Sequence, residues 1–175
     1  MVQYRRNFLS GASYFFTIAL LNRTSSLLID QIAILCNAFQ PVQAQRSFPL
    51  DAVVVMPDHL HSLWTLPSGE ADYPGRWRAI KTRFSCQIPR GEWRSASRAR
   101  KGERGTWQSQ CRERALCDER DKTRHVDYIP FNPVKHGQIS HVVQWTSSSF
   151  HRFVRQGIYP VDGGGGEAGS GGSGE

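Results

Sequence analysis

Two short apolar runs joined by a turn leave this chain few possible folds, and two histidines stand just after the turn. Residues 53–56 read Val-Val-Val-Met, Pro57-Asp58 interrupts them, and residues 59–66 read His-Leu-His-Ser-Leu-Trp-Thr-Leu. β-Branched and aromatic residues on both sides of a turn are typical of a pair of strands. Because successive side chains of a strand point to opposite faces, His59 and His61 must share one face.

A histidine pair on one strand face is half of a metal site. Neutral imidazole nitrogen is a good ligand for a divalent ion, and a strand holds two ligands in fixed mutual geometry. Histidines that only make structural hydrogen bonds produce the same pattern, so the pair by itself leaves both interpretations open. A third ligand and a reactive group elsewhere in the chain would favour a functional site.

The composition of the chain fits one globular domain. With 175 residues, 39% of them apolar, it can bury a substantial core. The four cysteines form no Cys-x-x-Cys pair, which favours reduced thiols in a cytoplasmic protein. The apolar stretch at residues 15–21 is far shorter than the roughly 20 residues of a membrane span, so we expect a buried strand and no membrane partner. The Gly, Ser and Glu residues of 163–175 predict a disordered tail behind a domain of residues 1–162.

Positive charge is concentrated in one segment. The net charge is +7, yet residues 76–114 alone hold twelve Lys and Arg against three Glu. An excess of this kind favours nucleic acid as a partner. Trp77, Phe84, Trp93 and Trp107 are interleaved with the charges, and arginine for phosphates with aromatic rings for bases is what single-stranded nucleic acid requires. A solvated basic loop is the alternative interpretation.

The first half of the chain reads as strands around one helix. Residues 14–21 predict a first strand, central in the sheet, and residues 50–56 and 60–66 predict the strand pair. A core helix is expected after the N-cap oxygens of residues 24–26. Pro41 should kink or end that helix.

The second half predicts two helices separated by a loop. Trp77, Ile80 and Phe84 recur on one helical face. Residues 89–106 are rich in Arg, Ser and Gly without periodicity, so we expect a flexible loop that orders on binding. A further helix is predicted over residues 116–129.

Tyr128 lies near the end of this second helix, and Asn132 follows four residues later. A phenol in such a place is usually a core or interfacial group, with a nucleophilic role as the alternative. On a continuous helix, a spacing of four residues would bring the Asn132 amide beside the phenol, where its oxygen could bind a divalent ion. Pro130 lies between the two and can bend the helix, because it lacks a backbone donor.

Several motifs in this order resemble the REP-associated tyrosine transposases, a branch of the single-tyrosine HUH transposases that act on single-stranded DNA. The likeness runs from residue 4 to residue 162. The matching motifs are Tyr4-Arg5-Arg6, Tyr14-Phe15-Phe16-Thr17, Val55-Met56-Pro57-Asp58-His59-Leu60-His61, Arg76-Trp77-Arg78, His125-Val126-Asp127-Tyr128-Ile129, Asn132-Pro133-Val134-Lys135-His136-Gly137 and Ser148-Ser149-Phe150-His151-Arg152. One departure is Arg112-Glu113-Arg114, where members of the family commonly carry Trp-Glu-His.

The resemblance implies both a fold and a reaction. The fold is α+β, an antiparallel sheet of four or five strands with packed helices and the tyrosine helix lying across the histidine strand. The family's His-hydrophobic-His motif falls on His59 and His61, its third polar ligand on Asn132 and its catalytic tyrosine on Tyr128. Mg²⁺ or Mn²⁺ at the three ligands would polarise a phosphate oxygen. Tyr128 would attack to form a 5′-phosphotyrosine and a free 3′-OH, without a nucleotide cofactor.

The implied substrate is a REP or related palindromic hairpin in single-stranded DNA. Trp93 or Trp107 could stack on bases. His125, His136 and His151 are expected to be structural or DNA-contacting. A nucleoid-associated protein, monomeric or a weak homodimer, is expected. The predicted DNA contacts are Arg76, Arg78, Lys81, Arg83, Arg98, Arg100, Lys101, Arg104 and Lys135.

Two other functions remain open at this point. Pro130 and the Arg112-Glu113-Arg114 departure would fit a catalytically impaired protein that still binds hairpin DNA. A metal-dependent nuclease that hydrolyses DNA, without a covalent adduct, would use the same residue types.

Overall fold

A computed structural model describes residues 8–163, and four antiparallel strands form its central sheet in the order β2-β3-β1-β4. β2 (Leu50–Val55) and β3 (His59–Thr65) are the strand pair predicted around the turn. β1 (Ser13–Ala19) pairs with β3 on one side and with β4 (Arg112–Ala115) on the other. The prediction that the first strand is central is therefore confirmed.

β4 is a strand that the sequence pattern did not predict. Its residues, Arg-Glu-Arg-Ala, carry no apolar alternation. The strand forms because β1 offers an open edge, along which Tyr14 to Thr17 pair with β4. The helix predicted over residues 116–129 is accordingly shorter: α5 runs over Glu119–Tyr128, and the Asp118 carboxylate caps it by accepting a hydrogen bond of 2.8 Å from the backbone N–H of Asp121.

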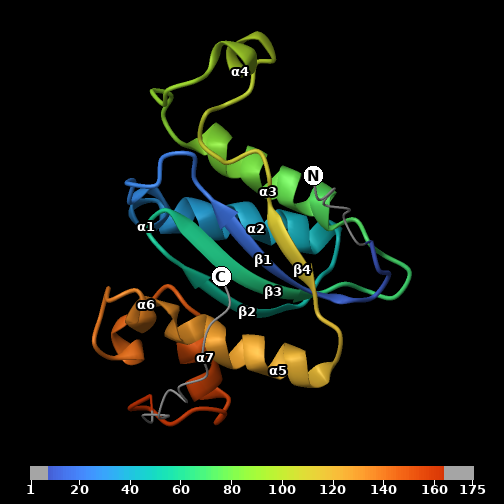
Figure 1. Cartoon of the computed structure of the whole chain (residues 1–175), viewed down its shortest axis with the longest axis vertical. Helices are drawn as coiled ribbons and strands as arrows, with labels where there is room; N and C mark the ends of the chain where they lie inside the picture. Colours follow the sequence, from blue (N-terminus) through green and yellow to red (C-terminus); the bar gives the residue numbers. More distant parts are fainter. Residues whose placement is uncertain (1–7, 164–175) are drawn as a thin grey trace, which may run out of the picture.

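α2 (Ile32–Gln45) and α3 (Tyr73–Gln87) cover one face of the sheet (Figure 1). The larger of the two apolar cores lies here. Trp64 of β3 stacks on Trp77 of α3 with ring centroids 4.4 Å apart, and Phe16 of β1 contacts both rings. Removing these aromatic surfaces from water fixes both helices against the sheet.

The first predicted helix differs from expectation at its start and at its end. It is divided into α1 (Leu27–Asp30) and α2, with a break at Gln31. α2 then continues through Pro41 to Gln45, so a helix end at Pro41 is wrong. The carbonyl that loses its donor belongs to Asn37, an exposed residue, so water can satisfy it while the buried residues on either side of the proline hold the helix on the sheet.

α5, the 3₁₀ turn η1 (Ile129–Phe131) and α7 (Phe150–Arg155) lie on the other face of the sheet (Figure 1). The second apolar core joins them to it through residues that include Leu63 of β3, Ile129 and Phe153. Strand alternation puts the histidines on the same side as Leu63. The helix that carries the tyrosine therefore covers the face that the two histidines share, as the resemblance implied.

Residues 89–106 are not the structureless loop that the sequence predicted. They contain α4 (Ala96–Arg100), whose N-terminus is capped by the Ser95 hydroxyl accepting from the backbone N–H of Arg98 at 3.3 Å. An ion pair between Glu92 and Arg104 joins the two ends of the segment. Figure 1 shows α4 at the far end of an excursion beyond α3. Internal polar contacts order this segment, and apolar periodicity does not reveal them.

The remaining elements are α6 (Asn132–Lys135) and the 3₁₀ turn η2 (Val142–Gln144). Among residues 8–163, no helix is long and apolar enough to cross a membrane. The Tyr4-Arg5-Arg6 motif lies outside the described residues, and so does the predicted tail apart from Gly163.

Candidate active site and nucleic-acid interface

His59 and His61 project side by side from β3. Their ring centroids are 4.9 Å apart and the ring planes make an angle of 80°. His59 is only 8% exposed. Backbone pairing of β3 with β1 on one side and β2 on the other fixes the positions from which both rings extend. The predicted pair is thus held on the rigid centre of the sheet.

Each histidine ring is oriented by a hydrogen bond at Nδ1. His59 Nδ1 donates to Asp58 Oδ1 at 2.8 Å, and the other oxygen of this carboxylate lies 2.6 Å from Arg23 Nε. His61 Nδ1 is hydrogen-bonded to Thr17 Oγ1 at 3.0 Å. The Nε2 atom of each ring is left as the nitrogen for a ligand. A metal-binding histidine characteristically has its second nitrogen engaged in this way.

Burial keeps His61 neutral. It lowers the pKa of His61 to about 4, and the neighbouring charges of His59, His136 and Arg23 add to the effect. Neutral imidazole is the form that binds a metal ion.

Asn132 offers a buried amide oxygen without a partner. The residue is fully buried, and its Nδ2 lies 3.5 Å from the Tyr128 carbonyl and 3.4 Å from the Ile129 carbonyl. Oδ1 has no hydrogen-bond partner among the described residues. Such an oxygen is costly to bury unless a ligand meets it, so it fits the predicted role of a hard metal ligand.

The turn after Asn132 brings His136 to the histidine pair. His136, whose backbone N–H donates to the Asn132 carbonyl at 2.9 Å, has its ring 5.9 Å from that of His59. No cluster of three or more His, Cys, Asp or Glu side chains suited to a metal ion occurs among residues 8–163. A three-ligand site here would therefore depend on the Asn132 amide, and the donor set of two imidazoles and one amide oxygen suits Mg²⁺ or Mn²⁺.

Tyr128 ends α5 and is 40% exposed. Its ring carries the Lys135 ammonium 4.1 Å from the centroid. Tyr128 and His61 line the same cavity, of about 570 Å³, between α5 and the sheet. The structure thus brings together two predicted site residues that are far apart in the sequence.

Pro130 interrupts the α-helical hydrogen-bonding pattern between Tyr128 and Asn132. The α-helix stops at Tyr128, η1 contains the proline, and α6 begins at Asn132. The condition of a continuous α-helix, under which the Asn132 amide would lie beside the phenol, is therefore not met. The Asn132 side chain contacts the main-chain carbonyl of Tyr128.

Arg76 lies in the protein interior, which corrects its prediction as a DNA contact. It is 1% exposed. Its guanidinium forms an ion pair with Glu70 and donates to the carbonyls of Asp72 at 3.0 Å and Arg46 at 3.3 Å. A buried guanidinium with its donors satisfied holds the start of α3 in place and cannot meet a phosphate.

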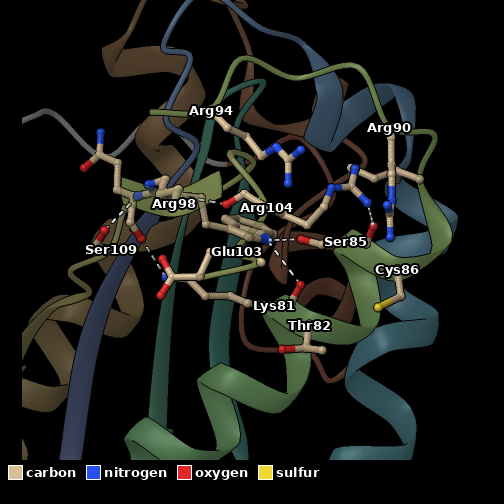
Figure 2. A pocket seen from close by; sticks show the side chains of 14 residues that line it. Lys81, Thr82, Ser85, Cys86, Arg90, Arg94, Arg98, Glu103, Arg104 and Ser109 are labelled. Carbon is tan, nitrogen blue, oxygen red and sulfur yellow. Dashed lines mark hydrogen bonds between the residues drawn. The ribbon is translucent and has the colours of Figure 1, made fainter. Parts of the chain in front are cut away.

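Three other predicted DNA contacts, Lys81, Arg98 and Arg104, hold the α4 excursion together. Arg98 donates to the carbonyls of Arg104 and Trp107, both at 3.0 Å, and Lys81 donates to the Gln108 carbonyl at 3.0 Å. Figure 2 shows these cations around a cavity of about 810 Å³. Burial also lowers the pKa of Lys81.

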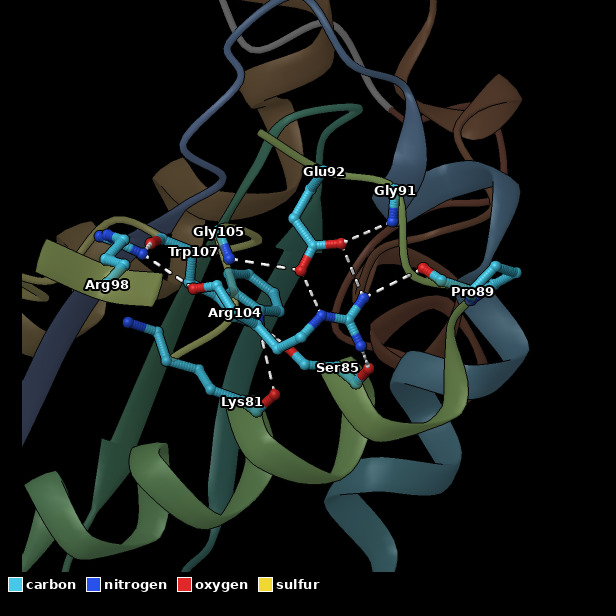
Figure 3. Close-up of polar contacts among 9 residues, drawn as sticks. All are labelled: Lys81, Ser85, Pro89, Gly91, Glu92, Arg98, Arg104, Gly105 and Trp107. Atoms are coloured by element: carbon cyan, nitrogen blue, oxygen red, sulfur yellow. Dashed lines mark hydrogen bonds and ion pairs between the residues drawn. The ribbon is translucent and has the colours of Figure 1, made fainter. Parts of the chain in front are cut away.

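Arg104 is the centre of this network (Figure 3). Its guanidinium pairs with Glu92 and donates to the carbonyl of Ser85, at 2.6 Å, and to that of Pro89, at 3.0 Å. The Arg104 hydrogen bond holds the pKa of Glu92 down at about 2. The donors of the Arg104 guanidinium are therefore used within the protein, and this residue holds the segment together.

The other predicted DNA contacts are exposed: Arg78, Arg83, Arg100, Lys101 and Lys135. Of the two candidate tryptophans, Trp93 is 75% exposed and free to stack on a base. Trp107 is 7% exposed, and its Nε1 donates to Ser85 Oγ at 3.1 Å. Trp107 is thus a core residue, and its predicted role as a stacking platform is wrong.

Sequence reasoning missed two arginines of the Tyr128 cavity. Arg114 of β4 and Arg124 of α5 line it together with Tyr128. Arg124 precedes the tyrosine by four residues, a helical spacing that could have revealed it. Arg114 belongs to the basic segment 76–114, but its place beside Tyr128 was not predicted, because the strand that carries it was not predicted.

The chain is similar to known proteins over nearly its whole length. It is 41% identical to the REP-associated tyrosine transposase of Escherichia coli K12 over 162 residues. This aligned stretch covers 93% of this chain and 90% of the relative. A Haemophilus influenzae protein that bears the same family name is also 41% identical, over 94% of each chain. No protein-family model matches the chain.

A solved structure of a REP-associated tyrosine transposase bound to a REP hairpin has the same fold. It is 40% identical in sequence, with a TM-score of 0.80 over 95% of this chain and 93% of that one. By sequence and by fold, this chain belongs to the REP-associated tyrosine transposases.

Proposed function

We propose that this chain cleaves and rejoins single-stranded DNA at REP-like hairpins through a 5′-phosphotyrosine intermediate on Tyr128. The observation that carries the proposal is the cavity that Tyr128 shares with His61, in a member of a tyrosine transposase family. Exposed Arg78, Arg83 and other cations of the basic segment would contact the DNA backbone.

The chemistry requires one nucleophile and balances without an oxidant or reductant. The Tyr128 oxygen attacks the phosphorus and loses its proton, the bond from phosphorus to the 3′ oxygen breaks, and that oxygen takes up a proton to become a free 3′-OH. A second 3′-OH can attack the phosphotyrosine, and the phenol is then released. One phosphodiester replaces another, so rejoining needs no nucleotide cofactor.

The proposed metal ligands are His59, His61 and the Asn132 amide oxygen. Mg²⁺ or Mn²⁺ bound to them would polarise an oxygen of the phosphate under attack. The chain's own contribution is orientation. Asp58 and Thr17 hold the imidazoles, and the helix end holds the phenol beside His61.

Covalent capture tests the proposal. Purified protein, Mn²⁺ and a 3′-labelled oligonucleotide carrying a REP hairpin with single-stranded flanks should give a labelled protein–DNA adduct that survives denaturation, because the attacked phosphate stays on the fragment with the 3′ end. Tyr128→Phe, and separately a chelator, should abolish the adduct, because the first removes the attacking oxygen and the second removes the metal. Hairpin binding by Tyr128→Phe serves as the control for folding.

Two results would contradict the proposal. Tight hairpin binding by the wild type without any adduct would indicate a protein that only binds DNA. Release of a free 5′-phosphate product, with no adduct at any time, would indicate hydrolysis by activated water.

A further inference from the structure

The cavity beside Tyr128 is bounded by the edge of the sheet as well as by α5. Phe15 of β1 pairs with Leu63 of β3 on one side and with Arg114 of β4 on the other. Directly opposed residues in a sheet share a face, so Arg114 lies on the face that carries His61. Thr17 pairs with His61 and with Arg112 in the same way. The edge strand thus adds two arginines to the histidine face.

Two arginines and two aspartates line this cavity, and the Arg124 guanidinium is the cation without a partner among the described residues. Arg124 is exposed and has no hydrogen bond or ion pair with any residue that the structure describes. Arg114 forms only a 3.5 Å contact with Asp121, and its side chain is 63% exposed. The second acid, Asp127, already accepts a 2.7 Å hydrogen bond from the Tyr159 phenol. Asp121 is thus paired with Arg114, and Asp127 keeps its charge while its oxygen accepts from the phenol. The Arg124 side chain has no hydrogen bond or ion pair with another described residue, so its guanidinium is available to a phosphate.

The floor of the cavity is aromatic. The Phe15 ring stacks on the His61 ring, with centroids 5.4 Å apart and planes within 17°, and lies 5.0 Å from the His125 ring. His125 Nδ1 donates to the Asp121 carbonyl at 2.8 Å, which holds this ring against the floor. Aromatic rings together with guanidinium groups in one cavity suit a base or sugar together with a phosphate.

We infer that this cavity is the subsite for one unpaired nucleotide next to the phosphate that Tyr128 attacks, with Arg124 and Arg114 pairing with the phosphate of that nucleotide. The inference rests on the proposed function, because it takes Tyr128 as the attacking group. The volume of about 570 Å³ lies within the roughly 300–1,000 Å³ of small-ligand pockets. Arg112, on the same face, continues the path for the backbone along the sheet edge.

Binding measurements on charge-neutral variants test the subsite. Arg124→Gln and Arg114→Gln are compared with Arg120→Gln, the same charge change at an exposed position of α5 that does not line the cavity. All are made in the Tyr128→Phe background so that no DNA is consumed. The probes are a fluorescent REP hairpin with single-stranded flanks and the same hairpin without flanks, measured by anisotropy over a range of salt concentrations.

For the flanked hairpin, each cavity variant should bind about tenfold more weakly and lower the salt slope by about one, because one phosphate contact is lost. Arg120→Gln should change affinity less than twofold. The flankless hairpin should bind all variants alike. Equal weakening by Arg124→Gln and Arg120→Gln would overturn the subsite, and so would equal losses for both probes, since the arginines would then contact the paired stem.

The result is separable from that of the adduct experiment. If the wild type forms no adduct, but Arg124→Gln still weakens binding of the flanked hairpin alone, the nucleotide subsite is supported and the proposed reaction is not. If the wild type forms the adduct, but Arg124→Gln does not weaken binding of the flanked hairpin, the proposed reaction is supported and the subsite is overturned. Arg124→Gln removes no hydrogen bond or ion pair with another described residue, and binding of the flankless hairpin by this variant serves as the control for folding.

Discussion

At the scale of single residues, the site depends on groups that orient the proposed ligands. Asp58 bridges the His59 ring and Arg23, and Thr17 holds the His61 ring. Asn132 presents a buried oxygen that no other described residue meets. Orienting partners of this kind raise the affinity of a metal site, because they fix the tautomer and direction of each ligand before the metal arrives.

Removing the carboxylate of Asp58 should weaken metal binding. We expect Asp58→Ala to reduce the affinity for Mn²⁺ by about 10- to 100-fold, measured by isothermal titration calorimetry on the DNA-free protein. Asp58→Asn keeps an acceptor for His59 Nδ1 but loses the ion pair to Arg23, so its affinity should be intermediate. Asp30→Asn, at an exposed position in α1, is the control. Unchanged affinity in Asp58→Ala would show that the ring orients itself without the carboxylate.

At the scale of elements, two irregular segments position the functional groups. The change from α5 through η1 to α6 ends the helix at Tyr128 and starts a new one at Asn132. The α4 excursion carries exposed cations and Trp93. The Glu92–Arg104 pair joins its two ends, and Arg104 also donates to the Ser85 carbonyl of α3. Its cations therefore divide into those that hold the segment and those that remain for DNA.

The Glu92–Arg104 pair should contribute stability that depends on pH. The pKa of Glu92 in the folded protein is about 2, below the ordinary value of 4.5, so the contribution is complete above pH 4.5 and is lost as the pH falls towards 2. Glu92→Gln should lower the free energy of unfolding by about 1 kcal/mol at pH 7, measured by urea unfolding. The difference in free energy of unfolding between Glu92→Gln and the wild type should become progressively smaller below pH 4.5.

A local readout accompanies this measurement. Trypsin should cut residues 89–106 faster in Glu92→Gln than in wild type at pH 7, because the fastening of the excursion is weakened. Trypsin should cut Glu103→Gln, which changes an exposed carboxylate of the same segment, at the wild-type rate. Equal cutting of all three proteins would mean that α4 is held without the ion pair.

At the scale of the whole molecule, two apolar cores lie on opposite faces of one sheet, and each holds a different set of helices. The larger core fixes α2 and α3 through aromatic contacts. The smaller one attaches the helical layer that carries Tyr128, and Ile129 is fully buried in it. The position of the proposed nucleophile therefore depends on the smaller core.

Ile129→Ala should cost about 2–5 kcal/mol in free energy of unfolding, since it leaves a cavity beneath the end of α5. Because the same residue follows Tyr128 directly, we also expect less covalent adduct at equal concentrations of folded protein. Ile158→Ala, at a position 58% exposed, is the matched control and should stay within about 0.5 kcal/mol of wild type. Stability is measured by urea unfolding and the adduct by denaturing electrophoresis.

The sequence by itself determined the sheet core and the identity of the candidate site. Alternation at residues 50–66 and the helical recurrence of Trp77, Ile80 and Phe84 reflect burial, which leaves a direct mark on the order of apolar residues. The family motifs placed His59, His61, Tyr128 and Asn132 in advance. The tertiary structure then put Tyr128 and His61 on one cavity.

Only the tertiary structure decided which charged residues face solvent and which hold the fold. Arg76 and Arg78 are alike in sequence, yet the first is buried and the second exposed. β4 and the Glu92–Arg104 pair likewise left no apolar pattern, and Arg114 of β4 entered the candidate site unpredicted. The physical reason is that a charge acts through its partners in space, and those partners lie far away along the chain.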